Sequence, residues 1–477
     1  MAEAGFGGRE VVIVEAARLP VGRGHEEKGY YKDSHPSTLL ATVYADLIAR
    51  AGIDPAEVGD VVCGCVQQFG EQGMNIGRNA WLQAGLPVEV PATTIDRQCG
   101  SAQQGINFAA ALIASGVHDV AIGGGVEHMG HISFADGFEV MKEHGAAFTP
   151  ELLERFDLVN QGLSAEMIAD KWEIPRSELD EIGVRSQQLA ARATEEGRFE
   201  REIIPFSVNG DTWVTDQGIR PGTDLETLSK LKPAFKEDGK ITAGNSSQVS
   251  DGAAAVLLMT AEKADELGVR SQELAAKATE EGRFEREVVP FAVNGDTYVT
   301  DQGIRPDTSL EKLSQLKPAF KEDGKITAGN SSQISDGAAA VLVMTREKAD
   351  ELGLKPRARI VDQTTVGVDP VIMLTGPIPA TQKLLERNGM QIDDIDLIEI
   401  NEAFASVVAA WRRELEPDMD RVNVNGGAIA LGHPLGSTGA RLITTLLHEL
   451  ERSDKEWGLV TMCCGGGLGT ATLIERL

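Results

Sequence analysis

An internal repeat constrains this chain more than any other feature of its sequence. Residues 184–268 recur in tandem as 269–353, and the two copies differ at 13 positions, so 85 − 13 = 72 are identical. Two units are too few for a solenoid, which usually needs at least three repeats to bury a continuous core. We therefore interpret the repeat as one segment copied inside a single-copy domain, where two near-identical segments compete for one place.

The flanks of the repeat indicate which copy fills that place. Removing one copy leaves 477 − 85 = 392 residues, and the second copy runs directly into the strand-like residues 354–361. We therefore expect the second copy to enter the core, with 327–345 inside the central layers. Part of 209–306 would then be the surplus. Extruding a surplus segment costs little loop-closure entropy, since that cost grows slowly with length.

The composition excludes several functional classes. The chain has 45 Lys and Arg against 73 Asp and Glu, a net charge of −28 at pH 7, which opposes nucleic-acid binding. Its sequence has no apolar run of membrane-spanning length, and its first residues lack the features of a signal peptide. The five cysteines are an odd number and lack paired CxxC motifs, so neither a disulfide framework nor a metal site is expected. We expect a cytoplasmic protein that binds neither nucleic acid nor membranes.

On both sides of the repeat, short β-rich runs alternate with amphipathic helical stretches. This alternation, in two similar halves, predicts α/β layers rather than an all-α or all-β fold. Three glycines at 123–125 are interpreted as the close of a strand. The predicted strands are 10–16, 60–66, 93–95, 117–122 and 395–400, and the predicted helices are 36–52, 100–115, 380–389 and 403–415.

A cysteine lies where a predicted strand turns into a helix. Cys99 stands in the segment DRQCGSA, directly before the predicted helix. The dipole and free N–H groups of a helix N-terminus favour a thiolate, the nucleophilic form of cysteine. The alternative is a small buried apolar residue, the usual fate of a free cysteine. Position alone leaves both readings open.

Two glycine-rich segments near the C-terminus carry further candidates. His433 stands between Gly432 and Pro434 in a glycine-rich loop, where it could serve as a general base or an oxyanion donor, or be a core histidine. Cys463 begins CCGGGLG, which predicts a glycine turn between strands, with either an incidental thiol or a second reactive one. Two thiols and an imidazole together indicate acyl transfer through a thioester.

These motifs resemble those of the thiolase family. The matching segments are RQCGSAQQ around Cys99, NEAFA at 401–405, GGAIALGHPLGSTGAR around His433, CCGGGLG from Cys463, and KITAGNSSQVSDGAAA. The resemblance implies an α/β, αβαβα layered fold of two similar halves with an inserted loop domain, here with one duplicated segment. Family members work as homodimers or homotetramers. The expected domains are an N-terminal half over 1–130 completed by about 317–353, an inserted loop domain with the surplus copy over 131–316, and a C-terminal half over 354–477.

The resemblance also implies roles for individual residues. Cys99 would be the acylated nucleophile, His433 its activator, and Cys463 the acid and base acting on the acetyl-CoA carbon. Asn401 would position a water that forms one oxyanion hole with His433. The N–H groups of Cys99 and Gly465 would form the other.

The serine that lies near coenzyme A in the family falls inside the repeat. It corresponds to Ser247 in the first copy or Ser332 in the second. Glu402 would help to orient the catalytic network. Coenzyme A is then a co-substrate, and the scheme requires neither a metal nor a permanently bound cofactor.

The implied activity is that of an acetyl-CoA C-acyltransferase of fatty-acid β-oxidation, which cleaves 3-ketoacyl-CoA with CoA into acetyl-CoA and a shortened acyl-CoA. The alternatives are acetoacetyl-CoA synthesis from two acetyl-CoA, and an inactive acyl-CoA binder whose site the repeat displaces. The segment EPDMDRVNVNGGAIALGHP looks closest to actinobacterial-type degradative thiolases, some of which act on steroid side chains. The chain departs from the family at Cys464, where an aliphatic residue is common.

Overall fold

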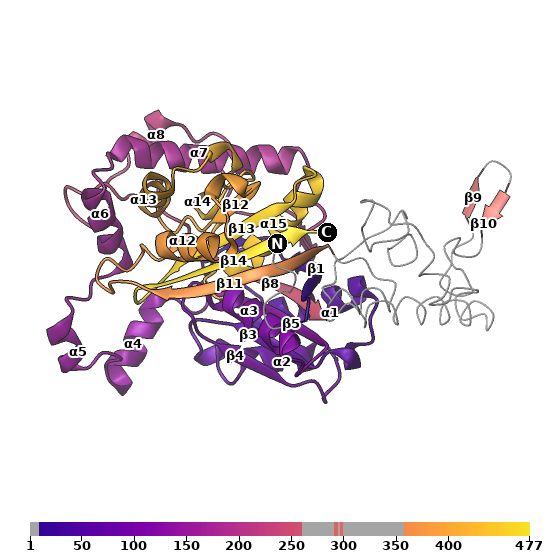
Figure 1. The fold of residues 1–477 in the computed structure, drawn as a ribbon. Helices are drawn as coiled ribbons and strands as arrows, with labels where there is room; N and C mark the ends of the chain where they lie inside the picture. Colours follow the sequence, from indigo (N-terminus) through magenta and orange to yellow (C-terminus); the bar gives the residue numbers. More distant parts are fainter. Residues whose placement is uncertain (1–8, 260–290, 294–295, 299–356) are drawn as a thin grey trace.

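A computed structural model describes residues 9–259, 291–293, 296–298 and 357–477. In this part of the chain, one ten-stranded mixed sheet runs through the molecule in the order β12-β13-β14-β11-β1-β8-β5-β3-β4, with β2 paired to β8 (Figure 1). Its strands are β1 Val12–Arg18, β2 Gly22–Arg23, β3 Asp60–Gly64, β4 Ala92–Ile95, β5 Val120–His128, β8 Ser250–Met259, β11 Ala358–Gly367, β12 Leu397–Ile400, β13 Trp457–Cys464 and β14 Leu468–Arg476.

The helices sort into layers around the two halves of this sheet. Helices α1 and α2 pack on strands of the N-terminal half, and α12, with α13 beside it, packs on strands of the C-terminal half. Helices α3 and α15 contact each other and strands of both halves, so they form the middle layer. The predicted αβαβα order is thereby confirmed. The helices are α1 Pro36–Ala51, α2 Ile76–Gln83, α3 Ser101–Ala114, α4 Phe134–His144, α5 Pro150–Arg155, α6 Gln161–Lys171, α7 Arg176–Glu195, α8 Leu225–Ser229, α12 Pro377–Asn388, α13 Ala405–Leu415, α14 Ala428–Leu431 and α15 Thr438–Arg452.

The first predicted helix shows how local sequence sets these boundaries. The His35 side chain accepts a hydrogen bond from the Ser37 N–H, and Pro36 occupies the first turn, where its missing N–H costs nothing. Gly52 adopts a left-handed conformation with φ of 64° and caps the last turn. The prediction for 36–52 is confirmed as α1.

The interpretation of the three glycines at 123–125 was wrong. They do not end a strand, because β5 continues through them to His128. A Cβ on Gly123 would lie 2.4 Å from the Cα of Ile106 in α3, and one on Gly125 would lie 1.9 Å from the carbonyl oxygen of Gly436. The glycines therefore allow α3 and the loop after His433 to lie directly on the sheet.

The first copy of the repeat, not the second, fills the place in the sheet. Strand β8 comes from the first copy and pairs antiparallel with β1 on one side and β5 on the other. This corrects the expectation that about 317–353 completes the N-terminal half. Residues 327–345 lie outside the described residues, and the other domain boundaries remain predictions.

A short hairpin forms in both copies. In the first copy, β6 Phe206–Val208 pairs with β7 Asp211–Trp213, and Phe206 lies opposite Trp213. In the second copy, β9 Phe291–Val293 pairs with β10 Asp296–Tyr298 in the equivalent register. This local element depends on neighbouring residues, whereas β8 requires partners far away in sequence.

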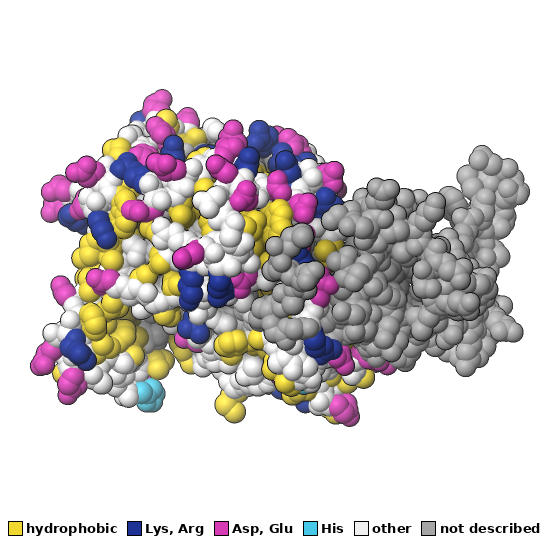
Figure 2. All heavy atoms as spheres, viewed as in Figure 1, with side chains coloured by type: hydrophobic (Ala, Val, Ile, Leu, Met, Phe, Trp, Pro, Cys, Tyr) yellow, Lys and Arg dark blue, Asp and Glu magenta, His cyan; other side chains and the backbone are white. Residues whose placement is uncertain are grey.

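The segment between β5 and β8 forms the inserted part of the fold, with α4 to α8 and the first hairpin. Helices α4 and α5 have no buried residues, and hydrophobic side chains gather on the surface there (Figure 2). None of the helices in the described residues is long and apolar enough to cross a membrane.

Candidate active site

A tight turn holds Cys99 between β4 and α3. The Asp96 carboxylate accepts the N–H of Gln98 at 2.6 Å, and the Ser101 N–H and hydroxyl both donate to the carbonyl of Gln98. Gln98 takes a left-handed conformation with φ of 50°, which most non-glycine residues avoid. The turn places Cys99 directly before α3, as the sequence predicted.

Burial works against a thiolate at this position. Cys99 is 3% exposed, and burial raises the pKa of its thiol to about 11. The hydrogen bonds that oppose this shift in pKa are smaller than the desolvation effect. Of the two readings that position alone left open, a reactive thiolate and a small buried residue, the burial of Cys99 is the feature that the structure shows. Cys99 rests as a neutral thiol at neutral pH.

Two hydrogen-bond donors from distant segments meet at the Cys99 sulfur. The N–H of Gly465 and the side chain of Gln161 both hydrogen-bond to it and lower the thiol pKa. Gln161 is the first residue of α6. Its Nε2 atom lies 3.1 Å from the position that a Cβ on Gly465 would occupy, so the two donors are neighbours. Sequence reasoning identified Gly465 and missed Gln161.

The glycine turn after Cys463 joins two strands, as predicted. Cys463 pairs with Gly469 across β13 and β14, and Gly466 and Gly467 take left-handed conformations in the turn. After the larger effect of burial, a Cys99 thiolate would raise the pKa of both Cys463 and Cys464, so both thiols lie within electrostatic reach of Cys99. All five cysteines are free and buried.

The adjacent Cys464 has a packing role. Its side chain faces the start of α3, where its sulfur lies 2.7 Å from the position that a Cβ on Gly100 would occupy. Since neighbouring residues of a strand point to opposite faces, Cys463 and Cys464 serve different layers.

Hydrogen bonds fix the tautomer of His433. Its Nδ1 lies 2.6 Å from the hydroxyl oxygen of Thr438, and that hydroxyl donates its one hydrogen to the carbonyl of Pro434. The oxygen must therefore accept a hydrogen from Nδ1. Nε2 is left unprotonated and faces Nδ2 of Asn401 at 3.3 Å. His433 thus presents a basic nitrogen next to Asn401.

The surroundings keep this imidazole neutral. Burial, and then the positive charge of Arg441, lower the pKa of His433 to about 3. His433 is 4% exposed. A neutral imidazole can accept a proton, so the site combines an un-ionised thiol with an un-ionised base.

Backbone pairing brings the NEAFA segment to the same place. The Asn401 N–H donates to the carbonyl of Thr461, two residues before Cys463, and the Ser247 N–H donates to the carbonyl of Ala403. Ser247 therefore lies beside the NEAFA segment at 401–405. Ser332 falls outside the described residues.

Glu402 ties this segment to the glycine-rich loop. Its buried carboxylate accepts hydrogen bonds from the Ser186 hydroxyl, the Asn423 side chain and the Ile429 N–H. The network spans α7, the loop after β12 and α14. It supports the orienting role that the family resemblance implied for Glu402.

Glu127 fastens the His433 loop to the half that carries Cys99. Its buried carboxylate accepts N–H groups from Val66, Gln67 and Gly436, and the side-chain amide of Gln72. Because Gly436 follows His433 closely, this carboxylate joins the two halves beside the site. Sequence reasoning did not assign Glu127 a role.

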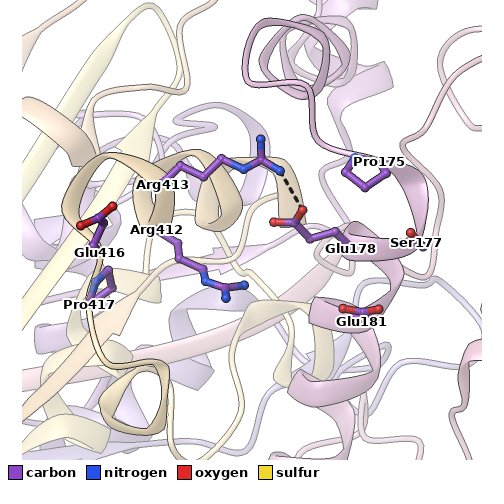
Figure 3. A pocket seen from close by; sticks show the side chains of 8 residues that line it. All are labelled: Pro175, Ser177, Glu178, Glu181, Arg412, Arg413, Glu416 and Pro417. Carbon is purple, nitrogen blue, oxygen red and sulfur yellow. Dashed lines mark hydrogen bonds and ion pairs between the residues drawn. The ribbon is translucent and has the colours of Figure 1, made fainter.

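A surface hollow lies away from these residues. It measures about 770 Å³ and lies between the start of α7 and the end of α13, where Arg413 and Glu178 form an ion pair of 2.8 Å (Figure 3). None of its lining residues belongs to the cysteine and histidine cluster. No group of three or more His, Cys, Asp or Glu in the described residues is arranged to hold a metal ion.

Comparisons with known proteins agree with this geometry. The family described as "Thiolase, N-terminal domain" matches 11–262 and again 260–347, and "Thiolase, C-terminal domain" matches 354–476. The chain is similar to the steroid 3-ketoacyl-CoA thiolase FadA6 of Mycobacterium tuberculosis, at 39% identity over 98% of this chain and 94% of that protein. It is also similar to an acetyl-CoA acetyltransferase of Syntrophomonas wolfei, at 38% identity over 98% of this chain and the whole relative.

A solved structure supports the same conclusion. The crystal structure of the Bacillus anthracis acetyl-CoA acetyltransferase matches with a TM-score of 0.71 and 32% identity, over 98% of this chain and 99% of that one. Both domain families, in their order along the chain, account for the residues that build the site. The chain belongs to the thiolase family.

Proposed function

We propose that this protein is an acetyl-CoA C-acyltransferase that cleaves 3-ketoacyl-CoA with CoA, giving acetyl-CoA and a shortened acyl-CoA. Two observations carry the proposal. The buried Cys99 thiol receives the Gly465 N–H within electrostatic reach of a second thiol. His433 presents an unprotonated imidazole nitrogen to Asn401. Relatives named 3-ketoacyl-CoA thiolase, such as that of Bacillus subtilis at 38% identity, support the degradative direction.

The first half-reaction acylates Cys99. The Cys99 thiol gives its proton to Nε2 of His433, and the sulfur attacks the 3-keto carbon of the substrate. The bond between C2 and C3 breaks, and its electron pair leaves with the acetyl-CoA enolate. The Cys463 thiol protonates that carbon, which releases acetyl-CoA and leaves an acyl thioester on Cys99.

The second half-reaction returns the enzyme to its starting state. The thiol of CoA gives its proton to the Cys463 thiolate and attacks the acyl carbon. The Cys99 sulfur leaves and regains a proton from His433. All bonds and protons balance without a metal or a redox cofactor, and CoA is a co-substrate.

Two sets of donors would stabilise the oxyanions of these steps. The N–H of Gly465, which already points at the Cys99 sulfur, would hold the acyl oxygen together with the N–H of Cys99. Asn401 would hold a water that serves the enolate oxygen with His433. Its buried Oδ1 makes no hydrogen bond to any described residue and is free to accept one from water.

Coenzyme A would enter beside the segment that carries Ser247. Phe235 and Phe404 form an edge-to-face pair there, with ring centroids 5.9 Å apart, and Phe235 is 41% exposed. Phe235 also packs against Gly162, the neighbour of Gln161. We assign Ser247 as the serine near CoA, because its N–H donates a hydrogen bond to Ala403 in the NEAFA segment.

We also infer a homodimer or homotetramer in the cytoplasm. The outer edge of β4 has no partner strand among the described residues. The side chains of Met74 and Val88 are exposed near this edge. Asn75, next to Met74, donates a hydrogen bond to the carbonyl of Ala92 in β4, and Arg78 donates one to the carbonyl of Val88. An unpaired sheet edge of this kind is suited to pairing with a second copy.

Thiolysis across a series of 3-ketoacyl-CoA chain lengths tests the proposal, with acetyl-CoA formation as the readout. We expect cleavage of substrates longer than four carbons, and loss of activity in Cys99→Ser. Activity confined to the four-carbon substrate would favour acetoacetyl-CoA synthesis. Binding of acyl-CoA with no turnover would identify a binder instead.

A further inference from the structure

Two parallel links join β12 to α15 behind the reaction centre. The first runs from Asn401, directly after β12, through His433 to Thr438 at the start of α15. The second is an ion pair of 3.6 Å between Glu399 Oε2 and Arg441 Nη1. Glu399 precedes Asn401 by two residues and Arg441 follows Thr438 by three. The ion pair therefore joins the same two elements about one strand period and one helix turn further from the reaction centre.

This deeper pair is buried and underbonded. Both side chains are 3% exposed. Neither Arg441 Nη1 nor Nη2, nor Glu399 Oε2, makes a hydrogen bond to a described residue. A buried guanidinium that lacks hydrogen bonds from its terminal nitrogens is costly, whether or not the neighbouring carboxyl is ionised. Its cost therefore suggests a role in the chemistry next to it.

Charged groups from several elements surround the pair. Besides Glu399, the groups that act on Arg441 are Arg18 of β1 and the carboxylates of Glu202 and Asp216 from the inserted segment. Glu202 also acts on Glu399, as do Glu402 and Glu449. For His433, Arg441 is the one charged group that acts on the imidazole.

We propose that Arg441 is a positioning residue that holds His433 as a neutral base against Asn401, and that Glu399 is its titrating counter-charge. Arg441 does not touch the reacting atoms. It acts through the imidazole, because a fixed positive charge disfavours imidazolium. The inference rests on the proposed acyl transfer to Cys99.

The pair gives the site a built-in pH response. Burial, opposed by Arg441, raises the pKa of Glu399 to about 8. Below this pH the carboxyl is protonated, and the charge of Arg441 acts on His433 unopposed. Above it, the carboxylate neutralises Arg441, so His433 becomes more basic. Arginine itself stays charged throughout this range.

The test is the single-turnover rate of Cys99 acylation by a 3-ketoacyl-CoA, measured between pH 3 and 10 for the full chain, so that the range reaches the His433 pKa of about 3. Arg441→Met removes the charge and keeps the length of the side chain. We expect the pH at which the acylation rate falls on the acidic side to rise by about one unit or more in this variant, toward the ordinary pKa of histidine. Arg441→Lys keeps the charge and should retain the wild-type profile. Arg413→Met, which breaks a surface ion pair near the hollow of Figure 3, is the matched control and should leave the profile unchanged.

Glu399→Gln covers the case in which Arg441→Met does not fold. We expect this variant to lose the inflection near pH 8. The inference is overturned by a folded Arg441→Met with a wild-type profile, or by an inflection that persists in Glu399→Gln. Absence of any acyl-Cys99 in the wild-type protein would instead refute the proposed function, so the two failures are distinguishable.

Discussion

The turn that carries Cys99 and the loop that carries His433 are built alike. Each precedes a helix of the middle layer, α3 or α15, and each side chain is almost fully buried. Burial raises the pKa of the thiol to about 11 and lowers the pKa of the imidazole to about 3. The same loss of water therefore makes both groups neutral, although one is an acid and the other a base.

The two regions differ in the neighbouring groups that shift the pKa of the thiol and of the imidazole in addition to burial. Cys99 receives N–H donors, which favour its charged form and oppose burial. At His433 the positive charge of Arg441 adds to the effect of burial, and both lower the pKa of the imidazole. The N–H donors thus oppose part of the burial effect on the thiol, whereas Arg441 reinforces the burial effect on the imidazole.

The pH dependence of alkylation tests the neutral state of Cys99. Because burial raises the pKa of its thiol to about 11, we expect alkylation by iodoacetamide to be slow at pH 7. The rate should rise about tenfold per pH unit up to pH 10. Peptide mass spectrometry can follow Cys99 separately from the other cysteines. A rate that levels off below pH 8 would show a resting thiolate.

Thr438→Val tests the tautomer of His433. The valine cannot accept the Nδ1 hydrogen, so Nε2 is no longer fixed as the base, and we expect kcat to fall by about 10- to 100-fold. Thr438→Ser keeps the hydroxyl and should retain most of the activity. Equal activity in the valine and serine variants, at equal thermal stability, would refute the assignment.

Gln161→Met tests the donor from the inserted segment. Loss of one hydrogen bond to the thiolate should raise the pKa of Cys99 further and slow its alkylation about tenfold at a given pH. Thermal unfolding serves as the control, because a structural role alone would change stability without changing alkylation in the folded protein. Unchanged alkylation would remove Gln161 from the site.

Deletion of 269–353 should have the smallest effect. Every contact described at the site comes from residues outside the second copy, and β8 of the first copy already lies between β1 and β5. Both copies end in KADELG, so the deletion leaves the same sequence before Leu354. We expect thiolytic activity within about twofold of the full chain per active site, the level at which surface changes are felt. Loss of activity would show that the second copy contributes to the active fold.

These expectations also show what the sequence could and could not reveal. Cys99, His433 and Cys463 lie in short motifs whose strand, turn and helix signals are local. The glycine turn after Cys463 follows from such signals, whereas the left-handed conformation of Gln98 was not predicted. The α/β class was likewise predictable from the alternating apolar runs, whereas the αβαβα order came from the family resemblance.

The remaining features depend on contacts between distant segments. Gln161 reaches Cys99 only because the inserted segment folds back over the turn, and nothing in its own helix marks it. Arg441 and Glu399 meet across two elements that are read separately in the sequence. The choice between two near-identical copies for β8 rests on the whole sheet, which is why the sequence favoured the wrong copy.

The most direct test of the account is intact-protein and peptide mass spectrometry after brief incubation with a 3-ketoacyl-CoA in the absence of free CoA. We predict one acyl adduct per chain, located on Cys99, absent from Cys99→Ser and released on addition of CoA. An adduct on another residue, or wild-type protein that turns over substrate without any adduct, would contradict the account.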